Sequence, residues 1–123
     1  MSCDVVLDVW DWSGVGDLAM SFQDWWIEQA AVEARQTVSK MEEYGSGDLV
    51  EIGRQMWQMA GRDVGLLPRV HAMEIGCMFY LLGKIARVTS AVERGDMASD
   101  DTWFDIGVYA KMVLAAREGA WQL

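Results

Sequence analysis

The sequence of 123 residues contains one proline, two cysteines and one histidine. Because proline interrupts helices, its rarity leaves room for long helical segments. Cys3 and Cys77 make no disulfide framework of the kind that stabilises small secreted domains. Cys77 and the lone His71 also fall short of the roughly four ligands of a structural zinc site. Disulfide-rich and zinc-stabilised folds are therefore excluded, and we expect His71, at a helix start, to lie at the surface or to cap the helix.

Positive charge is scarce. The chain carries 10 basic against 19 acidic residues, which gives a formal net charge of -9. An acidic chain repels phosphate backbones and anionic lipid headgroups, so nucleic acids and membrane surfaces are poor partners. A nucleotide is not excluded as a ligand, because divalent cations bridge carboxylates to phosphates.

Long hydrophobic runs and targeting segments are also lacking. The longest apolar stretch, "IGCMFYLLG" at 75–83, is far shorter than the roughly 20 residues that span a bilayer. The N-terminus has neither the basic nor the apolar region of a signal peptide. We therefore expect no transmembrane segment and a cytoplasmic location.

Hydrophobic residues make up 52% of the chain, enough for the core of one compact domain. The segments are rich in Ala, Met, Leu, Glu and Arg, which lose little side-chain freedom in a helix. Apolar spacing predicts four helices, at about 21–44, 47–60, 70–94 and 100–118. The prediction is an all-α four-helix bundle over residues 22–123, preceded by an N-terminal arm over residues 1–21.

Two helices have apolar lines that we expect to face the bundle. In the first helix the line consists of Ile27, Ala31, Ala34, Val38 and Met41. In the third helix, predicted to be central, it consists of Val70, Glu74, Cys77, Met78, Leu81, Ile85, Val88 and Val92. In the arm, a β-prone run at 5–10 has Trp10 and Trp12 as anchors on the helices or on a partner chain. The seven tryptophans fit either a core or an oligomer interface.

Carboxylates on these inward lines are the candidate chemistry. Asp100 and Asp101 stand in the first turn of the last helix, where capping and the helix dipole explain acidic residues. Asp105 lies a full turn further in, which capping does not explain. Glu74 interrupts an apolar line and would be costly there unless it is paired with a cation, bound to a metal or simply exposed.

Inward carboxylates from different helices build divalent-metal sites in helical bundles. Asp101, Asp105 and Glu74 are therefore candidate ligands of Mg²⁺. A basic ridge of Lys84, Arg87 and Arg94 follows the third helix. It is either a solvated face or, at Lys84 and Arg87, a phosphate-binding surface.

Three segments carry a family resemblance: "KMEEYG" at 40–45, "LLGKIAR" at 81–87 and "DDTWFDIGVYA" at 100–110. In this order and spacing they resemble phage-encoded MazG-like proteins of the all-α nucleotide pyrophosphohydrolase superfamily, nearest to a subgroup associated with nucleotide modification. The resemblance covers about residues 22–119. It implies Mg²⁺- or Mn²⁺-dependent cleavage of a nucleoside triphosphate into monophosphate and pyrophosphate, and a homodimer or higher homo-oligomer. A phage-encoded protein would act in the host cytoplasm.

The resemblance also implies site residues. Asp101 and Asp105 match acids of the family pattern and would bind the metal, with Glu43 and Glu74 as substitutes for the acids that this chain lacks. Glu74 and Asp105 would be catalytic. Substrate would be bound by Lys40, Lys84, Arg87 and Tyr109. The sequence departs from the family pattern at Gly83 and Met97, where the family usually has acids.

Two other functions remain open because of those departures. One is a catalytically inactive helical protein that binds a host or phage protein through its acidic, Trp-rich surface. The other is a nucleotide sensor without turnover.

Overall fold

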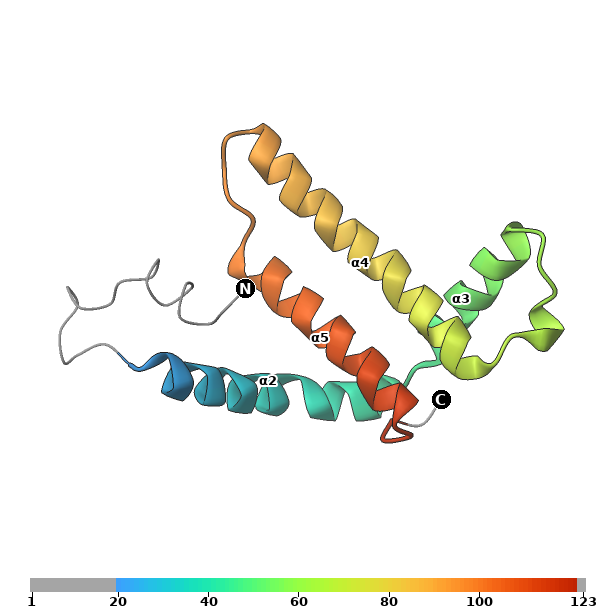
Figure 1. Cartoon of the computed structure of the whole chain (residues 1–123), viewed down its shortest axis with the longest axis horizontal. Coiled ribbons are helices and arrows are strands. Elements are labelled where there is room, and N and C mark those ends of the chain that lie inside the picture. The colour runs from blue at the N-terminus through green and yellow to red at the C-terminus, as the bar shows by residue number, and fades with distance from the viewer. Residues whose placement is uncertain (1–19, 122–123) are drawn as a thin grey trace. The chain divides into compact units, whose positions relative to one another are not determined.

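The computed structural model of the chain describes residues 20–121 (Figure 1). Within that range the elements are α2 (Phe22–Tyr44), α3 (Gly47–Met59), the 3-10 turn η2 (Val64–Leu66), α4 (Arg69–Glu93) and α5 (Asp100–Arg117). The described residues contain no strand. The predicted all-α fold with four helices is confirmed, and each predicted helix end lies within one residue of the observed one.

The chain divides into two compact units, one ending at Gln36 and the other beginning at Thr37. The second unit contains α3, α4, α5 and the last residues of α2. The β-prone run at 5–10, with Trp10 and Trp12, lies outside the described residues, so its role as an arm stays a prediction.

Glycine and serine set the helix ends. Gly45 ends α2 in the left-handed conformation (φ 68°), and its N–H donates to the carbonyl of Met41 at 2.9 Å. Gly95 ends α4 in the same way (φ 73°). At the start of α5 the cap is Ser99, whose Oγ accepts from the Thr102 N–H at 3.3 Å. Asp100 and Asp101 follow in the first turn of α5, where the sequence analysis places them.

Two glycines bring α3 and α4 into backbone contact. A Cβ added at Gly53 would lie 1.7 Å from the carbonyl oxygen of Ala72, and one added at Gly76 would lie 2.0 Å from that of Leu49. Any side chain at either position would push the helices apart. The close approach therefore depends on glycine at both positions.

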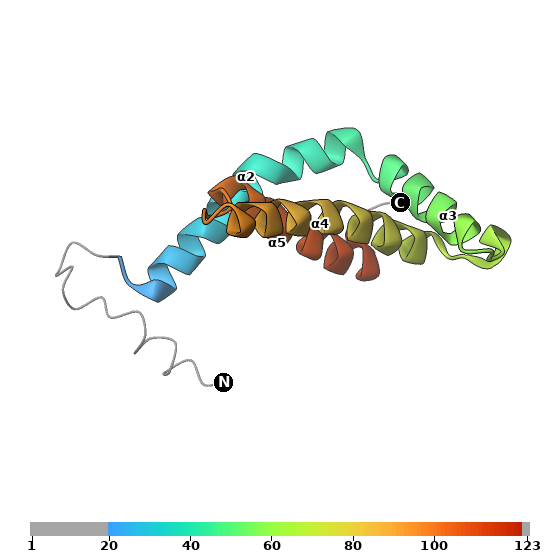
Figure 2. The ribbon, with the colours of Figure 1, turned by 90° about the horizontal axis from the view of Figure 1, so that it is seen from above.

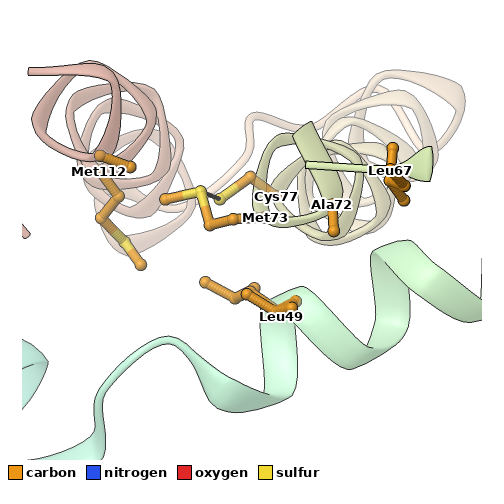
Figure 3. Close-up of a cluster of buried hydrophobic side chains, with 8 residues drawn as sticks. Leu49, Leu67, Ala72, Met73, Cys77 and Met112 are labelled. Carbon is orange, nitrogen blue, oxygen red and sulfur yellow. Dashed lines mark hydrogen bonds between the residues drawn. The ribbon is translucent and has the colours of Figure 1, made fainter. Parts of the chain in front are cut away.

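The core lies where α3, α4 and α5 meet, and Figure 3 shows Leu49 of α3 and Met112 of α5 around Met73 and Cys77 of α4. Met73 and Cys77 are fully buried, with their sulfur atoms 3.7 Å apart. The buried cluster consists of Leu49, Val50, Leu67, Ala72, Met73, Cys77, Met112 and Ala116. The predicted central position of α4 is confirmed, because α4 packs against both α3 and α5.

The predicted inward lines are partly wrong. In α2 only Met41 packs against the core, while Ile27 and Val38 are exposed. In α4 the prediction holds at Cys77, but Met78, Ile85 and Val92 are exposed. The reason is that α3 and α5 cover only two faces of α4, and its third face stays open.

The tryptophans divide between the two alternatives. Trp57 and Trp121 pack against the core, as a core role predicts. Trp25, Trp26 and Trp103 are exposed, as a role in an interface requires.

By length and composition α4 is also able to cross a membrane, although a central helix of a water-soluble protein passes the same test. Only 17% of its most apolar 18-residue window is buried. Most of this apolar segment of α4 is therefore not covered by other described residues.

Candidate functional site

An ion pair joins α4 to α5 at the predicted site. The Nζ of Lys84 donates to Oδ2 of Asp105 at 2.8 Å, and the lysine side chain is the more buried of the two. Asp105 was singled out because capping does not explain it. The structure gives it a cationic partner on the neighbouring helix, which supplies the compensation that an inward carboxylate needs.

A second ion pair joins the same helices further along. Arg117 donates from Nε and Nη2 to the two carboxylate oxygens of Glu74, with the Nη2–Oε2 distance at 3.0 Å. This two-point contact lowers the pKa of Glu74, through the hydrogen bond from Arg117 first and its charge second. Of the alternatives left open for Glu74, pairing with an arginine is the one observed.

Tyr109 lies between these two ion pairs. Its ring stacks on that of Tyr80, with centroids 5.5 Å apart and planes 6° apart. Burial, followed by the neighbouring Tyr80 and Asp105, raises the pKa of the Tyr109 hydroxyl. Tyr109 is therefore a neutral, half-buried ring within the α4–α5 contact.

The two ion pairs lie far apart. Glu74 and Lys84 are ten residues apart on α4, which is about 15 Å along the helix. Asp105, paired with Lys84, therefore lies well away from Glu74. Because α4 and α5 run antiparallel (Figure 2), Glu74 and Asp105 each face a basic residue on the other helix, and the two acids lie apart.

The remaining candidate ligands do not complete a metal site. Asp101 is exposed in the first turn of α5, and Glu43 is exposed near the end of α2. Across residues 20–121 no group of three or more His, Cys, Asp or Glu residues is placed to bind a metal ion. Within the described part of one copy, the donor set does not fit Mg²⁺, which needs several oxygen ligands.

A cavity of about 490 Å³ lies at the end of the α4–α5 pair, between the last two turns of α4, the connection that follows and the first turn of α5. Arg87 and Arg94 line it, together with Ser90, Ser99 and Thr102. Neither arginine has an ion-pair partner within the described residues. Two guanidinium groups without an ion-pair partner in residues 20–121 therefore meet three hydroxyls in one cavity. The hydroxyls of Ser99 and Thr102 are hydrogen-bonded to each other at 3.0 Å, so only one of the two is able to donate to a ligand.

These lining groups favour an anion. Guanidinium groups form paired, charge-assisted hydrogen bonds with phosphate oxygens, and hydroxyls donate to them as well. The start of α5 adds the partial positive charge of a helix N-terminus. Asp100 and Asp101, directly after Ser99, repel an anion that has no bound cation. They favour an anion whose charge is partly neutralised by a bound cation.

The other residues that the sequence analysis names either lie away from this cavity or line it without carrying a charge. Lys40 is exposed on α2, and no hydrogen bond or ion pair among the described residues joins it to the other candidates. Met97 lines the cavity, while Gly83 is exposed with open space around it. Burial raises the pKa of Cys77 to about 11, so it is not a nucleophile.

Sequence reasoning identified the basic ridge but missed the lining by Ser99 and Thr102. Part of the signal was present, since a serine directly before a helix is a favoured N-cap residue. What the pattern does not show is that the capped end faces Arg87 and Arg94.

A comparison of the chain with protein-family models, with curated proteins and with solved structures finds no match.

Proposed function

We propose that this chain is a MazG-like protein that binds a nucleoside triphosphate, and that it acts as or descends from a nucleotide pyrophosphohydrolase. The observation that carries the proposal is the pair of uncompensated guanidinium groups, Arg87 and Arg94, in one cavity. Arg87 also belongs to the "LLGKIAR" segment that suggested the family. In this proposal the polyphosphate lies against the two arginines.

The site residues divide into two groups under this proposal. Arg87 and Arg94, with Ser99 and Thr102, bind the phosphates. Lys84, Asp105 and Tyr109 fix the position of α5 against α4 and so the shape of the cavity. Lys84 is thus a positioning residue, because its ammonium group is already engaged by Asp105.

Hydrolysis to monophosphate and pyrophosphate is the finer part of the proposal. It requires divalent metal, and the described part of one copy brings no three ligands together. We therefore derive no metal-dependent step. Binding and turnover are tested separately.

The test of binding is a thermal shift with each canonical and modified dNTP and NTP, with and without Mg²⁺ or Mn²⁺. Arg87→Gln should weaken binding at least about tenfold, because a charge-assisted hydrogen bond contributes about 1.5–3 kcal/mol. The matched control is Arg69→Gln, since Arg69 is an exposed arginine at the opposite end of the same helix. Equal affinities of the two variants, or no binding by the unaltered protein, would refute the proposal.

The test of turnover is pyrophosphate release from the same nucleotides. Release by the unaltered protein that Arg87→Gln weakens and Arg69→Gln does not supports the enzyme. Binding without release indicates a nucleotide-binding protein without turnover.

A second function is favoured by a separate observation. Phe22, Trp25 and Trp26 form a cluster of exposed aromatic rings on α2, with centroids 5.9–6.5 Å apart. Exposed aromatic clusters are typical of protein-binding surfaces. Recovery of a host or phage protein that Trp26→Ala no longer binds, without any nucleotide effect, would favour this function.

A further inference from the structure

The first turns of α2 carry three exposed aromatic rings on one face. Trp25 and Trp26 follow Phe22 by three and four residues, the spacing that places side chains on the same side of a helix. The three side chains are 52% (Phe22), 47% (Trp25) and 63% (Trp26) exposed. We call these three residues the α2 aromatic face. Large rings that gather at a surface mark a place where another molecule binds.

The three rings form a triangle. The distances between their centroids are 5.9, 6.4 and 6.5 Å, and the plane of Trp26 is tilted by 52° and 66° from the planes of the other two. A cation over the middle of this triangle lies within about 6 Å of all three centroids, which is the range of a cation–π contact. The α2 aromatic face is therefore able to bind a cationic group as well as an apolar one.

The charge around the α2 aromatic face is negative. Residues 20–34 contain three acidic residues, Asp24, Glu28 and Glu33, and no basic residue. Glu28 is exposed and follows Trp25 by three residues, so it is a neighbour of that ring on the helix surface. Glu33 lies two turns beyond Trp26 on the same side of the helix. These carboxylates attract a cation to the rings and repel an anion.

We propose that the α2 aromatic face binds an arginine-rich segment of another protein, an inference that rests on the second function proposed above. Charge complementarity selects this partner. Guanidinium groups stack on aromatic rings and form paired hydrogen bonds with carboxylates, and this surface presents both. In this contact one guanidinium lies over the three rings, and the next basic residues of the segment meet Glu28 and Glu33.

An extended segment fits this surface better than other occupants. From Phe22 to Glu33 the surface follows about 16 Å of helix, which an extended chain of about five residues spans. A small free cation fits less well, because small-molecule sites enclose most of their ligand and these rings are about half exposed on one helix. A second copy of the chain fits less well too, because its net charge of -9 is repelled by the same carboxylates.

The test uses a fluorescently labelled peptide of about eight residues with alternating arginine and glycine, and follows its anisotropy with the full chain in about 50 mM NaCl. The unaltered chain should bind this peptide. A peptide with citrulline in place of arginine should bind at least about tenfold more weakly, because citrulline keeps the shape of arginine without its charge. Trp26→Ala should weaken binding of the arginine peptide at least about fivefold. Circular dichroism reports whether each variant remains helical.

Each substitution on α2 has a matched control on another helix. Trp103 is 54% exposed on α5, so Trp103→Ala removes a ring of similar exposure. Glu93 is exposed at the end of α4, so Glu93→Gln changes the net charge by the same amount as Glu28→Gln. Glu28→Gln should weaken binding about two- to threefold, and the two controls by less than about 1.5-fold.

Several results would overturn the inference. If the arginine peptide does not bind, the stated partner is wrong. Equal effects of Trp26→Ala and Trp103→Ala, or of Glu28→Gln and Glu93→Gln, would show that the net charge attracts the peptide to no particular surface. A dimer that Trp26→Ala dissociates would make the occupant a second copy. Sedimentation with phosphatidylcholine vesicles that Trp26→Ala abolishes would make it a lipid surface.

Failure of this inference is distinguishable from failure of the proposed functions. A host or phage protein that binds at Trp26 through a segment without basic residues would support the second function and overturn the inference. The nucleotide cavity belongs to the other compact unit, so Arg87→Gln should not weaken binding of the arginine peptide.

Discussion

At the scale of single residues, pairing explains the two carboxylates that the sequence made conspicuous. Glu74 and Asp105 each meet a cation on the facing helix, and each therefore avoids the cost of an uncompensated carboxylate. Neither carboxylate therefore needs a metal ion to balance its charge. In contrast, Arg87 and Arg94 lack such partners among the described residues and line one cavity, which leaves both guanidinium groups available to an anion there.

The Glu74–Arg117 pair predicts a pH dependence of stability. The pKa of Glu74 is lowered in the folded chain from its ordinary value of 4.5. A lowered folded-state pKa stabilises the fold above the unfolded pKa, and that stabilisation is lost as the pH falls through the folded value. Glu74→Gln should therefore unfold at a lower urea concentration than the unaltered protein near pH 7. The difference should close as the pH falls below about 4.5.

The control for this prediction is Glu93→Gln, which removes an exposed carboxylate with no ion-pair partner among the described residues. It should show little difference at any pH. A difference for Glu74→Gln that stays constant with pH would mean that Arg117 does not set the titration of Glu74.

At the scale of helices, the α3–α4 contact predicts opposite effects for two glycines of the same helix. Gly76→Ala places a methyl group on the Leu49 carbonyl and should destabilise the fold by about 1–3 kcal/mol or more. Gly83→Ala meets nothing within 4 Å and should stabilise it by about 0.5–1 kcal/mol. Urea unfolding of both variants measures the difference. Similar effects of the two substitutions would show that the helices do not approach this closely.

The elements also show what sequence patterns determine. Helix ends were predicted to within one residue because local residues set them: Gly45, the glycines and Pro68 of the 61–69 segment, and Gly95. The buried face of α4 was predicted less well. This helix has two apolar lines, and periodicity does not show which of the two lines a neighbouring helix covers. Buried Gly76 carries no hydrophobic signal at all, yet it is one of the two glycines at which α3 and α4 come into backbone contact.

Partner choice at the candidate site was beyond the sequence for a related reason. Asp105 and Glu74 are both acids on inward-facing positions, so the pattern suggested that they converge. Their distance depends on the antiparallel register of α4 and α5, which no local residue determines. The register is also what pairs Lys84 with Asp105 and Arg117 with Glu74.

At the scale of the whole molecule, the net charge of -9 opposes contact between two copies of the chain. The described residues of α4 nevertheless expose large apolar side chains, those of Met78, Leu82, Ile85 and Val92. In a homodimer, which the family resemblance implies, attraction between such side chains would be short-ranged, whereas the repulsion is long-ranged and screened by salt.

This opposition predicts that salt strengthens the homodimer that the family resemblance implies. Raising the NaCl concentration from about 20 mM to about 200 mM shortens the Debye length from more than 20 Å to less than 10 Å and weakens the repulsion. The dimer dissociation constant should then fall, by roughly two- to tenfold, in sedimentation experiments. A dissociation constant that rises with salt would indicate that ion pairs hold the two copies together.

The three contacts between α4 and α5 have one more consequence. Glu74–Arg117, Tyr80–Tyr109 and Lys84–Asp105 all belong to the same alignment of two antiparallel helices. A slip of either helix by one turn, about 5.4 Å, would separate all three pairs at once. Two ion pairs and a ring stack thus restrict the pair of helices to a single alignment. The small and flexible side chains of the same contact, such as Ala91, Met112 and Ala116, would tolerate several alignments.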